Sequence, residues 1–85
     1  MNEREKEILA ELQRILTVTL QSKQTVSPAD RLADCTVLDS LGLIIMAVGL
    51  ENRFRVKLSE QDVPGIETFA DVIALVDRRR LEAGR

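Results

Sequence analysis

Asp39-Ser40-Leu41 is the short stretch of this chain whose residue types best suggest side-chain chemistry. A serine hydroxyl can act as a nucleophile when a neighbouring base activates it, or it can be the point at which another group is attached. The chain contains no histidine, so the ordinary base for a serine nucleophile is missing. Leu38 also stands where a Gly-x-Ser-x-Gly elbow requires glycine. We therefore assign no catalytic residue. By this local pattern alone Ser40 is best interpreted as a helix N-cap, and an attachment role depends on residues outside this stretch.

The composition excludes several other kinds of site. Cys35 is the only cysteine, so an internal disulfide and a zinc cluster are both ruled out, and no metal site is expected. A formal charge of −2 is weak evidence against a nucleic-acid partner. The basic run Arg78-Arg79-Arg80 follows a helical pattern, and cations at a helix C-terminus interact favourably with the helix dipole.

No part of the sequence resembles a secretion or membrane signal. Residues 2–11 are heavily charged and contain no apolar signal segment. The uncharged, mostly apolar run from Leu41 to Leu50 is about half as long as a bilayer-spanning helix. We expect a cytoplasmic protein without a membrane span.

The elements that position Ser40 are predicted to be helices. The first extends from Glu3 to about Gln21, where apolar residues recur with the spacing of an amphipathic helix. A long connection from about Ser22 to Leu38 follows, and loops of this length in small domains are often functional. Apolar residues spaced along the connection indicate that it packs onto the core: Val26, Leu32, Val37 and Leu38.

A second helix is predicted to begin at Asp39-Ser40, because both residue types are preferred N-caps. By hydrophobicity alone, Leu41 to Val56 fits either a buried strand or a buried helix. Gly42 and Gly49 disfavour a helix by about 1 kcal/mol each. The length of the run and its polar end nevertheless favour the helix.

Two further signals complete the predicted fold. Residues 59–62 resemble one capped turn that Pro64-Gly65 would stop, and Thr68 caps a last helix with Asp71 in a variant of the capping box. That helix is expected to fray after Arg80. The prediction is an all-α bundle of four helices, three main and one short, forming a single domain over residues 1–85. Its core is aliphatic, since only two residues are aromatic.

Asp39-Ser40-Leu41 resembles the attachment motif of the acyl and peptidyl carrier proteins. The resemblance extends from Ile8 to Val76 and needs no gap after Ser40. Leu50-Glu51-x-x-Phe54-x-Val56 is similar to the end of the family's second helix, and Ile66-x-Thr68-x-x-Asp71 to the start of its last helix.

The resemblance implies a carrier and not an enzyme. In this family a phosphopantetheinyl transferase moves 4′-phosphopantetheine from coenzyme A onto the motif serine, and the thiol of this arm holds an acyl or aminoacyl group as a thioester. Carried over, Ser40 is the attachment residue, Asp39 helps to position it, and Leu41 contacts the modifying enzyme. A monomeric carrier would then present its cargo to ligases or synthases that dock on the second helix.

The predicted docking surface departs from the family's housekeeping type. Fatty-acid carriers of that type present carboxylates on the second helix, whereas Gly42 and Ile45 replace two of them here and only Glu51 remains. Residues at helical spacing form the predicted outer stripe: Leu41, Ile45, Val48 and Asn52. The stripe is either part of a wide core face or an exposed apolar strip on which partners dock. The second interpretation predicts a specialised carrier.

Several features of the sequence allow more than one interpretation. Val37-Leu38 replaces the family's glycine before the motif, which leaves the loop geometry undetermined. Met46, Val48 and Ile66 either line a cavity for an acyl chain or simply pack in the core. The alternative to a carrier is an unmodified helical interaction module of the same fold, and such a module would have no need of the Asp39-Ser40-Leu41 motif.

Overall fold

A computed structural model describes residues 1–83 of the 85-residue chain. Three main helices form the fold: α1 (Glu3–Arg14), α2 (Ser40–Phe54) and α3 (Phe69–Ala83). A π-helical turn, η1 (Ile15–Thr19), continues α1, and two 3-10 elements, η2 (Leu32–Asp34) and η3 (Glu60–Gly65), lie in the connections. Residues 1–83 contain no strand beyond an isolated bridge between Arg31 and Thr68. The predicted all-α bundle, with one short helix before the last main helix, is confirmed.

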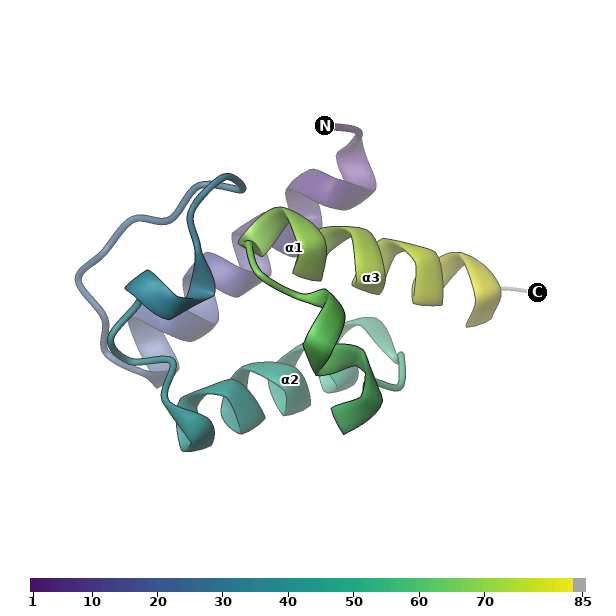
Figure 1. The fold of residues 1–85 in the computed structure, drawn as a ribbon. Helices are drawn as coiled ribbons and strands as arrows, with labels where there is room; N and C mark the ends of the chain where they lie inside the picture. The colour runs from purple at the N-terminus through teal and green to yellow at the C-terminus, as the bar shows by residue number, and fades with distance from the viewer. Residues whose placement is uncertain (84–85) are drawn as a thin grey trace.

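The helices pack around an aliphatic core. α1 contacts both α2 and α3, α2 lies along the lower edge of the view, and η3 crosses between α2 and α3 (Figure 1). The largest fully buried side chains come from all three main helices and from η1: Ile8, Leu12, Ile15, Leu16, Leu50, Phe69, Ile73 and Val76. No helix in the described range is long and apolar enough to cross a membrane.

The long connection before α2 is hydrogen-bonded to α1 and to the start of α3. The Gln13 side chain of α1 accepts a hydrogen bond from the Val26 backbone N–H (2.8 Å). At the other side, the Phe69 N–H donates to the Asp30 carbonyl (3.1 Å). Val26, Cys35 and Leu38 are buried in the main core, which confirms that this connection packs down. The approach to Ser40 is therefore anchored at several points.

The ends of the first and last helices differ from the sequence-based prediction. The helical backbone stops before Gln21, which has a left-handed φ of 56°. The last helix continues to Ala83 and does not fray after Arg80. Tertiary contacts explain the extension, because Arg79 pairs with Asp62 (2.7 Å) and the Arg80 guanidinium stacks over the Phe54 ring (4.7 Å).

The short helix and the last N-cap follow from local hydrogen bonds. η3 includes Pro64 and Gly65, the residues predicted to stop it. A proline removes only one hydrogen bond from a short 3-10 helix, and the Ile66 N–H after it still donates to the Val63 carbonyl (3.0 Å). The predicted capping box at α3 is confirmed. Thr68 N–H donates to the Asp71 carboxylate (3.0 Å), and Asp71 N–H donates to the Thr68 hydroxyl (3.3 Å).

Candidate functional site

Ser40 is the first residue of α2, and its side chain is exposed. The N-cap is Asp39, whose Oδ1 accepts a hydrogen bond from the Gly42 N–H (2.8 Å). Asp39 has the extended backbone expected of an N-cap, with φ −75° and ψ −171°. The Ser40 hydroxyl has no hydrogen-bond partner within residues 1–83, so it is not needed to cap the helix.

Backbone N–H groups lie beside that hydroxyl. In an α-helix the first N–H groups have no partner within the helix. Asp39 satisfies those of Gly42 and Leu43, through its side chain and its carbonyl respectively. Within the described part of the chain, the N–H groups of Ser40 and Leu41 have no acceptor. Free N–H groups and the positive end of the helix dipole favour a phosphate at this position, so these residues fit a phosphodiester on Ser40.

Gly42 allows the preceding loop to pass directly over the start of α2. A Cβ at this position would lie 1.9 Å from the carbonyl oxygen of Val37, far inside contact distance. The glycine that argued against a helix is therefore required by the approach of the loop. The Val37-Leu38 segment forms this close approach, and Leu38 is buried in the core.

Gly49 has a related role further along α2. A Cβ there would lie 2.8 Å from Cδ1 of Ile15, at the contact between α2 and η1. Both glycines inside α2 therefore mark close packing and not a break in the helix.

The outer face of α2 carries exposed apolar side chains. Leu41, Ile44 and Val48 are 64%, 60% and 47% exposed. Asn52 is also exposed, whereas Ile45 is only partly exposed. Ile44 is not part of the predicted stripe. Spacings of three and of four residues both fit a helical stripe, and only the rotation of α2 determines which of two neighbouring residues is exposed.

The carboxylate of Glu51 is directed back to the polypeptide. Its Oε2 accepts a hydrogen bond from the Leu58 N–H (2.8 Å), and this bond holds the connection between α2 and η3. The backbone carbonyl of Glu51 also accepts the N–H of the C-capping residue Arg55. Glu51 is the only acidic residue of α2, and its carboxylate is engaged by the backbone of the following connection.

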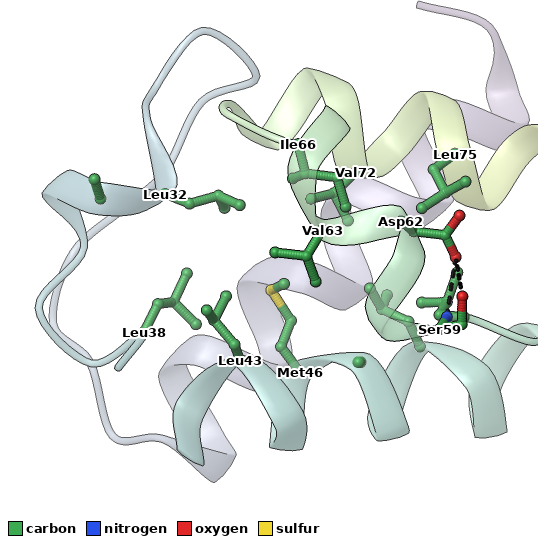
Figure 2. A pocket seen from close by; sticks show the side chains of 14 residues that line it. Leu32, Leu38, Leu43, Met46, Ser59, Asp62, Val63, Ile66, Val72 and Leu75 are labelled. Atoms are coloured by element: carbon green, nitrogen blue, oxygen red, sulfur yellow. Dashed lines mark hydrogen bonds between the residues drawn. The ribbon is translucent and has the colours of Figure 1, made fainter. Parts of the chain in front are cut away.

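A cavity of about 270 Å³ lies between α2, α3, η2 and η3. Figure 2 shows Leu38 and Leu43 at the end nearest the start of α2, Met46 and Val63 facing each other, and Ser59 with Asp62 at the opposite end. Nearly all of its lining side chains are apolar. Met46 and Ile66 line this cavity, whereas Val48 lies on the outer face of α2.

At the polar end of the cavity, the Asp62 carboxylate accepts hydrogen bonds from Ser59 and Arg79. The Ser59 N–H donates to Asp62 Oδ2 (2.9 Å), and Arg79 donates to Asp62 Oδ1 (2.7 Å). The hydrogen bond from the Ser59 backbone, followed by that from Arg79, lowers the pKa of the Asp62 carboxyl below its ordinary value. Asp62 therefore stays ionised at neutral pH and fixes η3 against α3.

Comparison with known proteins identifies the family. Over 75 residues, this chain is 32% identical to the meromycolate extension acyl carrier protein of Mycolicibacterium aurum, a match that covers 87% of the chain and 77% of that protein. The chain belongs to the acyl carrier protein family. The acyl carrier protein of Rhodococcus erythropolis is 30% identical over 79 residues, covering 92% of this chain and 87% of its own. That of Coprothermobacter proteolyticus is 35% identical over 77 residues, covering 88% and 92%.

No family model matches the chain. Within residues 1–83, no group of three or more His, Cys, Asp or Glu side chains is placed to hold a metal ion. Asp39, Ser40 and Leu41, the predicted attachment residue and its two predicted partners, lie next to one another at the exposed start of α2.

Proposed function

We propose that this chain carries acyl groups on a 4′-phosphopantetheine arm attached to Ser40. The observation that carries the proposal is the free Ser40 hydroxyl, which is exposed at the start of α2 while Asp39 alone caps the helix. The relatives named acyl carrier proteins support the same role. An unmodified interaction module would gain nothing from a serine kept free in this way.

The attachment step assigns separate roles to the three residues. The Ser40 oxygen bonds to the pantetheine-side phosphorus of coenzyme A, the pyrophosphate bond breaks, and adenosine 3′,5′-bisphosphate leaves. The base that takes the hydroxyl proton comes from the phosphopantetheinyl transferase, since the chain has no histidine. Asp39 holds the first turn of α2 so that Ser40 faces solvent, and the exposed Leu41 contacts the transferase. Once attached, the arm supplies the thiol that forms thioesters with acyl or aminoacyl cargo.

Partner enzymes are proposed to dock on α2 beside the arm. The proposed contact residues are Leu41, Val48 and Asn52 on the outer face, the partly exposed Ile45 at its edge, and the exposed Ile44. Docking through apolar side chains distinguishes a specialised carrier from the acidic housekeeping type. In this proposal the protein is a monomeric cytoplasmic carrier of one domain and catalyses no reaction itself.

The cavity between α2, α3, η2 and η3 is proposed to shelter an acyl chain. Its volume of about 270 Å³ exceeds the roughly 150 Å³ of an apolar protein cavity that binds benzene. Leu43, three residues after Ser40, lies at its near end, so a chain on the arm can enter from the attachment site. The hydrogen-bonded Ser59 and Asp62 lie at the far end.

Intact-mass spectrometry tests the attachment. The chain is incubated with coenzyme A, Mg²⁺ and a broad-specificity phosphopantetheinyl transferase, beside Ser40→Ala as the control. The expected result is one phosphopantetheine addition to the parent chain and none to the variant. Ser40→Ala should remain folded by circular dichroism, because the cap at Asp39 is intact. No addition to the folded parent, with several transferases, would favour the unmodified interaction module.

Asp39 provides a second arm of this test. Asp39→Asn keeps a side-chain oxygen for the Gly42 N–H, whereas Asp39→Ala removes the cap and should cost about 1 kcal/mol of stability. Slow modification of a well-folded Asp39→Asn would assign the negative charge to transferase recognition. Slow modification of Asp39→Ala alone would assign the residue to positioning.

A further inference from the structure

The surface of α2 that extends from Ser40 changes from apolar to basic along its length. At 100° per residue, Leu41, Ile44, Val48, Asn52 and Arg55 fall on one stripe. The first three side chains are the exposed apolar residues of this helix. Arg55 follows at its C-cap, and Lys57 comes two residues later, both of them exposed.

The carboxylates of this region are used internally. Between residues 39 and 57 the only acidic residues are Asp39 and Glu51. Asp39 accepts the Gly42 N–H and Glu51 accepts the Leu58 N–H, each at 2.8 Å. Every acidic side chain of the segment therefore already has a backbone donor as its partner.

The two cations at the end of the stripe, Arg55 and Lys57, have no such internal partner among the side chains of residues 1–83. Within residues 1–83, neither Arg55 nor Lys57 has a carboxylate at salt-bridge distance. Arg53 differs from both, because it turns toward α1, where its Nε lies 3.9 Å from Glu11 Oε1. Cations near a helix C-terminus also interact with the helix dipole, but that effect acts on stability and is independent of any partner.

We propose that the enzymes served by this carrier present an apolar depression bordered by carboxylates. Leu41, Ile44 and Val48 fill the depression, and Arg55 and Lys57 pair with the carboxylates at its border. This pattern is opposite in charge to the basic patches that housekeeping fatty-acid carriers meet. The inference rests on the proposed function, since it concerns partners of a modified carrier, and it specifies their surface chemistry.

A pair of probe enzymes tests the sign of the charge. One is a fatty-acid ketosynthase whose carrier-docking patch is basic, and the other is the same enzyme with the lysines and arginines of that patch replaced by glutamate. The carrier is used only after intact mass has shown the phosphopantetheine addition, so failure of the proposed function is detected separately and first. Surface plasmon resonance then gives the Kd for each probe.

The expected result is a preference of about twofold to thirtyfold for the charge-reversed probe, the range expected for two exposed ion pairs. The double variant Arg55→Glu/Lys57→Glu should reverse the preference. Lys23→Glu/Arg31→Glu is the matched control, because both cations are exposed in the loop before α2 and should leave the preference unchanged. Salt near 1 M, where the screening length is about 3 Å, should abolish it. Ile44→Ser should weaken binding to both probes.

Three results would overturn the proposal. They are equal or tighter binding to the basic patch, a preference that survives Arg55→Glu/Lys57→Glu, and no measurable binding of the modified carrier to either probe. Thermal melting of each variant accompanies the binding data. A change in stability of Arg55→Glu/Lys57→Glu without a change in its preference is the second of these results, and it would assign the cations to the helix dipole alone.

Discussion

The Glu51 carboxylate and the Leu58 backbone N–H are joined by a hydrogen bond of 2.8 Å across seven residues of sequence. This bond closes the turn between α2 and η3, which brings η3 over the cavity. Glu51→Ala should destabilise the fold by about 1–3 kcal/mol, because it leaves a partly buried N–H without an acceptor. Glu51→Gln keeps an acceptor oxygen and should lose less. Urea unfolding measures both.

The two Glu51 variants also separate structure from docking. If Glu51 acted chiefly as a docking charge, both variants would be equally impaired in partner binding and equally stable. A fall in stability confined to Glu51→Ala is the outcome that the hydrogen bond requires.

Gly42→Ala is expected to destabilise the protein although alanine is the better helix former. Relief of the contact with the Val37 carbonyl, 1.9 Å from a Cβ, requires movement of loop backbone. Overpacking of this kind costs about 1–3 kcal/mol, more than the roughly 1 kcal/mol gained in helix propensity. The displaced loop should also slow modification at Ser40, which the transferase assay measures.

Gly65→Ala is the matched control for that substitution. A Cβ at Gly65 has nothing within 4 Å, and its φ is not positive. It should be neutral or add about 0.4–1 kcal/mol of stability by restricting the unfolded chain. Equal stabilities for the two variants would show that the loop does not need a glycine at residue 42.

Stability should fall on acidification, in part through Asp71. Hydrogen bonds from the backbone N–H groups of Glu67 and then Thr68 lower the pKa of this carboxyl in the folded protein. A folded-state pKa below the unfolded value of about 3.9 contributes stability that is present above that value. The contribution is lost as the pH falls through the lower folded-state pKa.

The difference in melting temperature between the parent and Asp71→Asn should therefore be largest near pH 7 and shrink below about pH 4. Asp34→Asn is the control, at an exposed carboxylate that accepts no hydrogen bond within residues 1–83. A difference for Asp71→Asn that stayed constant from pH 7 to pH 2 would contradict the assignment.

Cavity occupancy should be visible by NMR. In the carrier loaded with a medium-length acyl chain, the methyl resonances of Met46 and Ile66 should shift relative to the unloaded carrier, because both side chains line the cavity. Ala47→Leu places a larger side chain in the lining and should suppress those shifts. Val48→Leu, on the exposed outer face, is the control and should retain them. Acyl-independent resonances in the parent would mean that the cargo stays outside the bundle.

Elements with local signals could be predicted from the sequence alone. Thr68 and Asp71 specify the last N-cap through side chains three residues apart, and the spacing of Ile8, Leu12 and Ile15 specifies the buried face of the first helix. Asp39-Ser40-Leu41 could be recognised as the candidate site, because an N-cap and a three-residue motif are both short-range features of the sequence. These interactions form within one or two turns, so the pattern alone carries them.

Tertiary structure decided what depends on residues distant in sequence. Arg79 and Arg80 extend the last helix through Asp62 and Phe54, which no local pattern indicates. The packing of Gly49 against Ile15 helps to fix the rotation of α2, and this rotation exposes Ile44 more than Ile45. Sequence periodicity gives the spacing of a face, but only contacts with the other helices determine which side of α2 meets solvent.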